Sequence, residues 1–302
     1  YGDHRDLHLS IRRQRQMCIR DRHWTQSPIP NGKVGETFVY PDPPTENVVM
    51  GSPVDEFDDS AREACGVVGV YARGEEAARA VFFGIYALQH RGQESAGIAT
   101  SDGRSIRAHT EMGLVGQAFQ EYDLSRLPGY LSIGHTRYST TGSSNISNAQ
   151  PIISKGTSVE IALGHNGNVI NALELREELF DWGLSFESTA DSEIIAHLIS
   201  NAPADNWSDR AAYAMRRLQG AYSLVIMTVD KLVGMRDPLG VRPLCIGRLN
   251  GGWVLASESC ALDHIGAEYV REVEPGEAVV IDDDGLKSVY KKSSKGSFGN
   301  CV

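Results

Sequence analysis

Four short segments of the chain carry side chains that could act together on an amide. Cys65 opens an apolar run and is followed by Gly66, so its thiol lies at the end of an element, where a neighbouring backbone or a ligand can approach closely. A thiol in that position is a candidate nucleophile, although most cysteines are small buried apolar side chains. The interpretation of Cys65 therefore depends on the groups that accompany it.

Three polar segments supply candidate groups. Arg137 follows a predicted strand, where its planar guanidinium could hold a carboxylate at two points or form a surface salt bridge. Asn166 and Gly167 end another predicted strand, and this pair fits a hairpin turn and an oxyanion-binding amide beside a free backbone N–H equally well. Asp191 leads into a predicted helix, either as its N-cap or as a carboxylate that holds an ammonium.

Together these segments provide a nucleophile, a carboxylate clamp, an oxyanion donor and an ammonium-binding carboxylate. Attack on the side-chain amide of a free amino acid requires that set. The attack also needs a base, because an ordinary thiol has a pKa of about 8.5 and is mostly protonated at neutral pH. An α-amino group on Cys65, with a pKa of about 7.7 to 8.0, would serve as base and acid, but only if the chain began at this cysteine.

An α+β fold has to position these residues. Short β-type runs dominate from residue 65 onward, and strands and helices come in blocks, which favours antiparallel sheets covered by helices over a doubly wound parallel sheet. No repeat is visible. The predicted strands are 65–71, 95–100, 130–135, 159–164, 221–228, 231–235, 244–248, 252–256, 278–281 and 287–290, and the predicted helices are 75–90, 171–182, 192–200 and 208–218.

Composition restricts the class of protein. The 302 residues suffice for one large domain or two modest ones, and 41% hydrophobic with 23% charged residues is typical of globular proteins. The net charge of −10 disfavours a nucleic-acid surface, and no apolar run is long enough to span a membrane. Five scattered cysteines without a C-x-x-C pair argue against a disulfide framework or a zinc site. We expect a cytoplasmic protein whose partner is a small molecule or another protein.

Residues 1–64 differ in composition from the rest of the chain. Residues 1–22 are basic and non-periodic, and proline is frequent up to about residue 60. The basic run could be a nucleic-acid or targeting arm, but such a segment cannot bury enough apolar surface to order itself. We therefore expect residues 1–64 to be a disordered extension or a propeptide.

From Cys65 to about Tyr290 the chain resembles the glutaminase domain of the amidophosphoribosyltransferase family. The resemblance implies a four-layer αββα sandwich of the N-terminal-nucleophile hydrolase type, with a glutamine amidotransferase type 2 domain over residues 65–292. The motifs that carry it occur in family order: Cys65-Gly-Val-Val-Gly, Leu88-Gln-His-Arg-Gly-Gln-Glu94, Gly134-His-Thr-Arg-Tyr, His165-Asn-Gly-Asn168, Asp191-Ser-Glu193, Arg236-Asp-Pro-Leu-Gly-Val-Arg-Pro-Leu244 and Ala256-Ser-Glu-Ser-Cys-Ala261.

The resemblance implies a reaction. Cys65 resembles a nucleophile that forms a γ-glutamyl thioester and releases ammonia, and Asn166 with the N–H of Gly167 resembles the oxyanion hole. In a full-length enzyme of this family, the ammonia makes 5-phosphoribosylamine from phosphoribosyl pyrophosphate, the first step of purine synthesis. The family thus implies a glutamine amidotransferase and glycosyltransferase, of which the residues present would supply the glutaminase.

The resemblance also implies how glutamine is held. Arg137 and Asp191 resemble the groups that bind its α-carboxylate and α-ammonium, and Thr140 assists them. The loop at Arg91 and Gly92 closes over the amide. We interpret the segment 236–244 as structural, because Asp-Pro-Leu-Gly is good turn chemistry between two strands.

The chain departs from the family at both ends. Sixty-four residues precede Cys65, more than the short propeptide that some members remove. Because Glu63-Ala64-Cys65 resembles the end of such a propeptide, and because the base requires a free amine on Cys65, we expect cleavage between Ala64 and Cys65. Residues 293–302 are interpreted as the start of a linker to an absent phosphoribosyltransferase domain. Residues 278–283 imitate the apolar run and paired acids of a phosphoribosyl-pyrophosphate loop, but the sequence that follows favours a hairpin.

The family also implies cofactors and assembly for a full-length enzyme. Cys301 lies where some members place an iron–sulfur ligand, and a cluster needs four thiolates. We therefore expect no cofactor in the residues present, and magnesium with, in some members, a 4Fe-4S cluster in the full-length enzyme. A homo-oligomer is expected when the enzyme is complete.

Three other interpretations stay open from the sequence. The first is the glutaminase domain of another amidotransferase, such as glucosamine-6-phosphate synthase, which the segments 236–238 and 257–261 disfavour. The second is an unprocessed, non-catalytic interaction module, which intact mass would distinguish. The third is a thiol-based redox or metal protein, which would need cysteines paired in space.

Overall fold

The computed structural model describes residues 65–138 and 145–292. The chain divides into two units, residues 1–62 and 63–302, and every described residue belongs to the second. Thr140, Cys301 and the predicted segments 1–64 and 293–302 lie outside the described residues. None of the described helices has the length and apolar character needed to cross a membrane.

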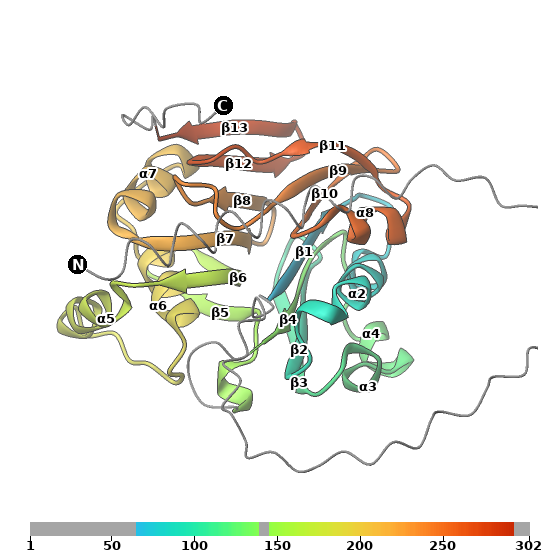
Figure 1. The fold of residues 1–302 in the computed structure, drawn as a ribbon, viewed down its shortest axis with the longest axis horizontal. Helices are drawn as coiled ribbons and strands as arrows, with labels where there is room; N and C mark the ends of the chain where they lie inside the picture. The colour runs from blue at the N-terminus through green and yellow to red at the C-terminus, as the bar shows by residue number, and fades with distance from the viewer. Residues whose placement is uncertain (1–64, 139–144, 293–302) are drawn as a thin grey trace, which may run out of the picture. The chain divides into compact units, whose positions relative to one another are not determined.

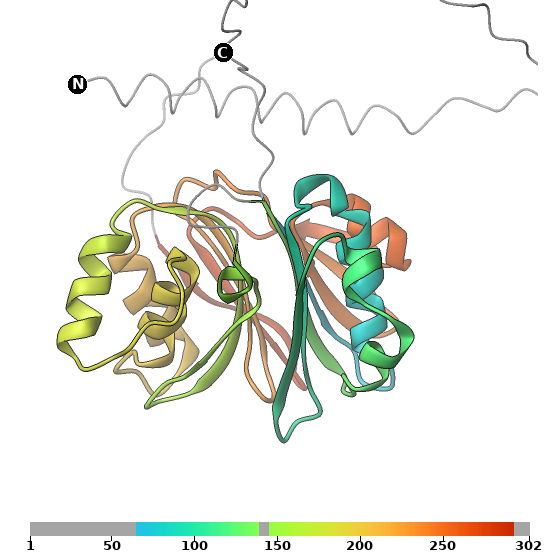
Figure 2. The same cartoon turned by 90° about the horizontal axis from the view of Figure 1, so that it is seen from below.

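Two antiparallel sheets pack face to face, and helices cover the outer face of each (Figures 1 and 2). This arrangement is a four-layer αββα sandwich, as expected from the sequence. One apolar core lies between the two sheets. A second core lies between the first sheet and its helices, and a third lies between the second sheet and its helices. The cavity described below opens at one end of the sandwich, where β1 begins.

The first sheet has seven strands and carries Cys65 at the start of a central strand. Its outer face is covered by α2 (Ala77–Ala87), α3 (Val115–Ala118), α4 (Glu121–Ser125) and α8 (Ser259–Ile265), with the short 3-10 helix η1 (Gln89–Arg91) after α2. In spatial order the strands are β11 (Glu268–Glu272), β9 (Cys245–Leu249), β10 (Gly252–Ala256), β1 (Gly66–Tyr71), β4 (Leu131–Arg137), β2 (Ser95–Ser101) and β3 (Ile106–Met112).

The second sheet has six strands and is covered by α5 (Ala172–Asp181), α6 (Asp191–Ser200) and α7 (Trp207–Arg217). The 3-10 helix η2 (Ile146–Asn148) precedes its edge strand. In spatial order the strands are β13 (Gly285–Lys291), β12 (Glu277–Asp282), β8 (Leu232–Arg236), β7 (Gly220–Met227), β6 (Glu160–Val169) and β5 (Ile152–Lys155).

Strand β1 is buried on both faces, which explains its continuous apolar sequence. Val68 and Val70 face α2, whereas Val67 and Tyr71 face the other sheet. Gly69 allows the sheets to approach closely, because a Cβ there would lie 2.7 Å from Val225 and 2.8 Å from Leu232. The start of β1, and with it Cys65, is therefore fixed from both sides.

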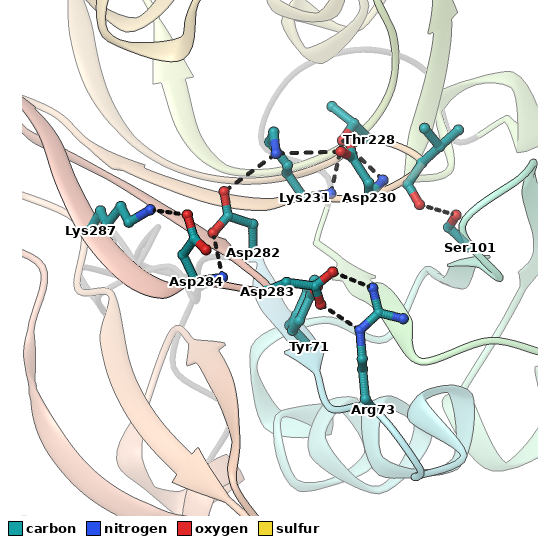
Figure 3. A network of polar contacts seen from close by, with 11 residues as sticks. Tyr71, Arg73, Ser101, Thr228, Asp230, Lys231, Asp282, Asp283, Asp284 and Lys287 are labelled. Atoms are coloured by element: carbon teal, nitrogen blue, oxygen red, sulfur yellow. Dashed lines mark hydrogen bonds and ion pairs between the residues drawn. The ribbon is translucent and has the colours of Figure 1, made fainter.

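A network of polar contacts joins the two sheets at the far end of β1 from Cys65 (Figure 3). The Tyr71 hydroxyl donates to the Asp283 carboxylate at 2.8 Å, and Arg73 donates to the other oxygen of Asp283 at 2.7 Å. The Ser101 hydroxyl of β2 donates to the Val229 carbonyl at 2.6 Å. The β12–β13 and β7–β8 turns of the second sheet are thereby attached to the first.

The predicted strands and main helices are confirmed, but the strands β3, β5 and β11 and the helices α3, α4 and α8 are missing from the prediction. Strand β3 is an edge strand with charged residues and partial exposure, so it lacks the apolar run that reveals a buried strand. Strand β11 is likewise a charged edge strand, whereas β5 is only four residues long. Strand β6 continues to Val169, past its predicted end at residue 164.

Candidate active site

Four segments that are distant in sequence meet around one small cavity. Gly66 of β1 pairs with Thr136 of β4, so Cys65 lies beside Arg137. Strand β6 and the N-terminal end of α6 close the other side. The cavity is lined by Cys65, Arg137, Tyr138, Gln150, His165, Gly167, Ala190, Asp191 and Ser192. Cys65, Arg137, Gly167 and Asp191 were all predicted from the sequence, and the structure places them around the same space.

The Cys65 thiol is held by the backbone of Tyr138. The Tyr138 N–H donates to Sγ at 3.4 Å, and the thiol donates to the Tyr138 carbonyl at 3.6 Å. Burial raises the pKa of Cys65, while the Tyr138 N–H and the positive charges of Arg137 and Arg91 act in the opposite direction. Because burial prevails, Cys65 stays a thiol at neutral pH unless a base removes its proton.

Asn166 and Gly167 lie inside strand β6, opposite Ser223 and Tyr222 of β7. The predicted strand end and hairpin turn are therefore wrong, because β6 passes through this pair without reversing. Gly167 has φ +150°, and a Cβ there would lie 2.0 Å from the Ala221 carbonyl oxygen. Only glycine fits this position without strain, and its irregular backbone faces the cavity.

The Asn166 side chain is fully buried, and neither its Oδ1 nor its Nδ2 has a hydrogen-bond partner among the described residues. An unsatisfied buried amide costs about 1 to 3 kcal/mol, so such groups need an explanation. A ligand oxygen placed beside Nδ2 would remove the cost. The Nδ2 group of Asn166 is therefore a candidate hydrogen-bond donor to a bound substrate.

Arg137 forms a buried ion pair rather than the surface salt bridge considered above. Its side chain is 4% exposed, and its Nη1 lies 2.5 Å from Glu94 Oε1. The second oxygen of Glu94 is buried without a hydrogen-bond partner among the described residues. This pair fixes the guanidinium at the wall of the cavity. Glu94 was quoted only as part of a motif, and its pairing is not visible in the sequence.

Asp191 is the first residue of α6, and Ala190 is the N-cap, so the N-cap interpretation is wrong. Its carboxylate accepts a hydrogen bond from the Val169 N–H at 3.0 Å and lies 3.5 Å from His165 Nδ1. Burial would raise the pKa of Asp191, but His165 and the Val169 N–H hold it below the ordinary value. The cavity therefore contains an ionised carboxylate.

Glu193 positions the loop that leads to Asp191. Its carboxylate accepts hydrogen bonds from the N–H groups of Glu187 and Ser188, both at 2.8 Å, and from the Ser188 hydroxyl at 2.7 Å. A carboxylate in the first turn of a helix is also favoured by the helix dipole. Asn148 of η2 contributes by accepting from the Thr189 N–H at 3.0 Å. Residues 187–190 are thus attached on two sides.

Arg91 and Gly92 lie next to Cys65 but do not line the cavity. Arg91 Nε donates to the Cys65 carbonyl at 3.2 Å, and its guanidinium pairs with Glu258. A Cβ on Gly92 would lie 2.6 Å from the Thr136 carbonyl carbon, so only glycine allows this approach to β4. The closure of this loop over an amide stays a prediction.

The segment 236–244 is tied together internally, in line with its structural interpretation. Arg236 donates to the carbonyls of Arg242 at 2.8 Å, Val273 at 2.7 Å and Gly240 at 3.0 Å. The buried Asp237 carboxylate accepts from the N–H groups that follow it in the loop. These contacts link β8 to β9 and fix the backbone of Arg242.

The side chain of Arg242 was missed by the sequence analysis. Its Nε is buried without a hydrogen-bond partner among the described residues. Burial lowers its pKa, the nearby charge of Arg91 adds to this effect, and Cys65 opposes it. The guanidinium therefore lies within electrostatic range of the nucleophile, which no local pattern could reveal because Arg242 is distant from Cys65 in sequence.

Comparison with known proteins places this arrangement among glutamine-using enzymes. A family model described as a glutamine amidotransferase domain matches residues 135–264. The chain is 52% identical over 239 residues to the amidophosphoribosyltransferase of Synechococcus elongatus, covering 77% of this chain and 48% of that protein. It is 44% identical over 251 residues to the amidophosphoribosyltransferase of Mycobacterium tuberculosis, covering 81% of this chain and 48% of that protein.

Solved structures agree with the sequences. The structure of the allosteric regulatory enzyme of purine biosynthesis matches with a TM-score of 0.70 at 42% identity, covering 74% of this chain and 48% of that one. The B. subtilis glutamine phosphoribosylpyrophosphate amidotransferase, in complex with ADP and GMP, matches with a TM-score of 0.69 at 42% identity and the same coverage. The chain spans about half the length of the relatives it matches.

Sequence, fold and cavity thus agree on one class. The described residues form a glutamine amidotransferase domain with the fold of the N-terminal-nucleophile hydrolases. Within that class, the chain is similar to the amidophosphoribosyltransferases, which it matches over about half of their length. These relatives favour the amidophosphoribosyltransferases over glucosamine-6-phosphate synthase, which is one of the three alternatives that the sequence left open.

Proposed function

We propose that the chain hydrolyses glutamine at Cys65 and releases ammonia. The observation that carries the proposal is the buried Asn166 amide, which has no partner among the described residues and lies in β6 between His165 and Gly167, two residues that line the cavity of Cys65. A buried donor beside a candidate nucleophile is the arrangement that stabilises a tetrahedral oxyanion. The rest of the cavity wall matches the two charged groups of an α-amino acid.

The substrate is held by charge complementarity in this proposal. The ionised Asp191 pairs with the α-ammonium of glutamine, and Arg137 pairs with its α-carboxylate. Arg137 keeps its orientation through Glu94, so the guanidinium is pre-organised before substrate binds. Thr140 assists, and the Arg91–Gly92 loop closes over the amide; both roles come from the family resemblance.

The reaction proceeds in two halves. A base takes the Cys65 proton, the thiolate attacks the amide carbon, and the oxyanion is bound by Asn166 Nδ2 and the Gly167 N–H. Return of the proton to the amide nitrogen breaks the C–N bond, releasing ammonia and leaving a γ-glutamyl thioester. Water, deprotonated by the same base, then attacks the thioester and frees glutamate and the thiol.

The base in this proposal is the α-amine of Cys65 after removal of residues 1–64. Burial raises the thiol pKa, so the proton does not leave unaided. In the full chain the nitrogen of Cys65 is part of a peptide bond and is not basic. Arg137 and Arg91 bring positive charge near the sulfur and favour the thiolate once the amine accepts its proton.

We extend the proposal to a longer protein on the basis of this similarity. There the ammonia would be used to make 5-phosphoribosylamine from phosphoribosyl pyrophosphate in the cytoplasm, by a homo-oligomer with a phosphoribosyltransferase domain. The magnesium ion and the iron–sulfur cluster implied for such an enzyme would involve groups outside residues 65–292. No step of glutamine hydrolysis described above passes through either.

The test is to compare N-terminal sequence with glutamate release. Protein that begins at Cys65 should release glutamate and ammonia from glutamine, whereas uncleaved protein and the Cys65→Ser variant should not. Cys245→Ser, which changes a buried cysteine outside the cavity, is the matched control and should retain activity. Activity in protein that starts upstream of Cys65 would contradict the proposed base. A chain that stays uncleaved, together with inactivity of protein that begins at Cys65, would favour the interaction-module alternative.

A further inference from the structure

Three metal-ligating side chains converge outside the cavity. His90 Nε2 lies 3.2 Å from Glu258 Oε2, and Cys260 Sγ lies 3.6 Å from the same oxygen. All three ligand atoms lie within 4.8 Å of one another. His90 and Glu258 are 168 residues apart in the chain, so spacing alone gives no sign of the cluster.

The three residues are supplied by fixed elements of the first sheet's helical layer. His90 belongs to η1, and its Nδ1 lies 3.2 Å from the Ala87 carbonyl, which leaves Nε2 directed at Glu258. Glu258 is the N-cap residue of α8, and Cys260 is in the first turn of that helix. Helices α2 and α8 pack side by side and hold the two halves of the cluster together (Figure 1).

We propose that His90, Glu258 and Cys260 form a binding site for a divalent transition-metal ion of the zinc class. An imidazole nitrogen, a carboxylate oxygen and a thiolate suit zinc or cobalt, whereas calcium and magnesium prefer oxygen ligands alone. The thiolate and the carboxylate balance the charge of the ion. His90 is half-exposed, so the ion can enter from solvent and water can complete a tetrahedral shell.

A second layer of contacts supports the carboxylate ligand. Glu258 turns Oε2 toward His90 and Cys260, while its Oε1 pairs with Arg91. Carboxylate ligands of metal sites commonly have such an outer partner, which fixes their orientation. Arg91 in turn donates to the Cys65 carbonyl, so one residue connects the proposed site to the nucleophile. The proposal concerns metal binding and does not depend on glutamine hydrolysis.

The experiment uses the 302-residue chain with Cys18, Cys65 and Cys301 replaced by serine, so that Cys245 and Cys260 are the remaining thiols. Titration with Co²⁺ should produce a thiolate-to-cobalt absorption band at one equivalent, and Zn²⁺ should displace the cobalt. Because an ion that binds the folded state stabilises it, excess Zn²⁺ should also raise the Tm. Cys260→Ser should abolish the band, and His90→Gln should weaken binding by roughly 10- to 100-fold or more.

Matched controls separate the cluster from other ligands. Cys245→Ser removes the other cysteine, and His264→Gln changes an exposed histidine of the same helix, α8. Both should leave the band and the affinity unchanged. A chain without the band, or one whose band survives Cys260→Ser, would overturn the proposal. If Cys260→Ser lowers the Tm without metal, equal cobalt affinity of the His90→Gln and His264→Gln variants would still contradict it.

Discussion

At the scale of single residues, the buried amide of Asn166 leads to a prediction for the rate of glutamine hydrolysis. Asn166→Ala removes one oxyanion donor and should lower kcat by roughly 10²- to 10³-fold with little effect on KM. Asn168→Ala is the matched control, because Asn168 lies two residues along β6 and is exposed. Steady-state kinetics on protein that begins at Cys65 provides the measurement. Equal rates for the two variants would reduce Asn166 to a structural residue.

The pKa of Cys65 makes a second residue-scale prediction. Because burial raises the pKa of this thiol, alkylation of uncleaved protein by iodoacetamide should be slow at neutral pH. Its rate should increase with pH and reach its midpoint above that of a short peptide with the same local sequence. Mass spectrometry of the Cys65 peptide at a series of pH values gives the two midpoints. A lower midpoint in the protein would mean that Arg137 and Arg91 outweigh burial.

Several of the residues around the cavity could be predicted because the chemistry of glutamine requires their types. Cys65, Arg137 and Asp191 fall into this group. Glu94 and Arg242 could not be predicted, because their significance comes from a buried ion pair and from a guanidinium Nε without a partner in residues 65–138 and 145–292, and both exist only once distant segments meet. Local spacing carries no information about such tertiary pairing.

At the scale of elements, Glu193 is expected to control both stability and substrate affinity. Glu193→Gln replaces an acceptor of three hydrogen bonds with an amide whose NH₂ faces N–H donors, so it should cost about 1 to 3 kcal/mol of unfolding free energy. Loosening of residues 187–190 should also displace Asp191 and raise KM for glutamine more than it lowers kcat.

Urea unfolding and steady-state kinetics measure the two effects of Glu193→Gln. The exposed Glu187→Gln is the matched control and should change neither, because its side chain lies outside the network while its N–H remains. An unchanged KM in a destabilised Glu193→Gln variant would limit Glu193 to a purely structural role.

The elements themselves were predicted well where periodicity is strong. Helix α2 lies within the predicted helix 75–90, where Val81, Ile85 and Leu88 recur at helical spacing, and all three side chains are fully buried. The turn alternative for the Asn-Gly pair in β6 is wrong because an Asn-Gly turn signal is local, whereas the pairing of β6 with β7 decides that the strand continues. Edge strands such as β3 escape because their polar, partly exposed sequence resembles a loop.

At the scale of the whole molecule, a buried histidine connects the two sheets. His135 of β4 donates from Nε2 to the His165 carbonyl of β6 at 3.0 Å. Burial lowers the pKa of His135 to about 3. In the unfolded chain its pKa returns to about 6.5, so the unfolded state binds more protons between these values. Stability should therefore increase with pH through this window and decline as the pH falls from about 6.5 toward 3.

The contribution of His135 can be isolated by substitution. His135→Gln keeps an N–H donor but does not titrate, so the variant should lose less stability than the wild type between pH 6.5 and pH 4. At about 1.4 kcal/mol per pH unit, the difference should reach a few kcal/mol. Urea unfolding across this range measures it, with the partly exposed His109→Gln as the control. Identical pH slopes for wild type and His135→Gln would contradict the prediction.

The β12–β13 hairpin is the whole-molecule feature that bears on phosphoribosyl pyrophosphate. The acidic run that imitates a loop for this compound forms a hairpin tip, as the sequence predicted. Asp282 lies 3.3 Å from Lys231 Nζ, and Asp283 pairs with Arg73, which holds the pKa of Asp283 down to about 2 (Figure 3). Asp283 thus attaches the second sheet to the first, and the acids of this tip repel a polyanion.

The last prediction follows from that placement. After removal of residues 1–64, the protein should release glutamate and ammonia from glutamine, and phosphoribosyl pyrophosphate should leave the rate of release unchanged. The same protein should form no phosphoribosylamine. Residues 65–302 carry 21 Lys and Arg against 28 Asp and Glu, and this net charge of −7 offers a polyanionic substrate no general attraction. Glutamate release with and without the compound is the measurement, and the Synechococcus elongatus amidophosphoribosyltransferase is the positive control. Stimulation of the cleaved protein, or any phosphoribosylamine formed by it, would place a second substrate site within residues 65–302.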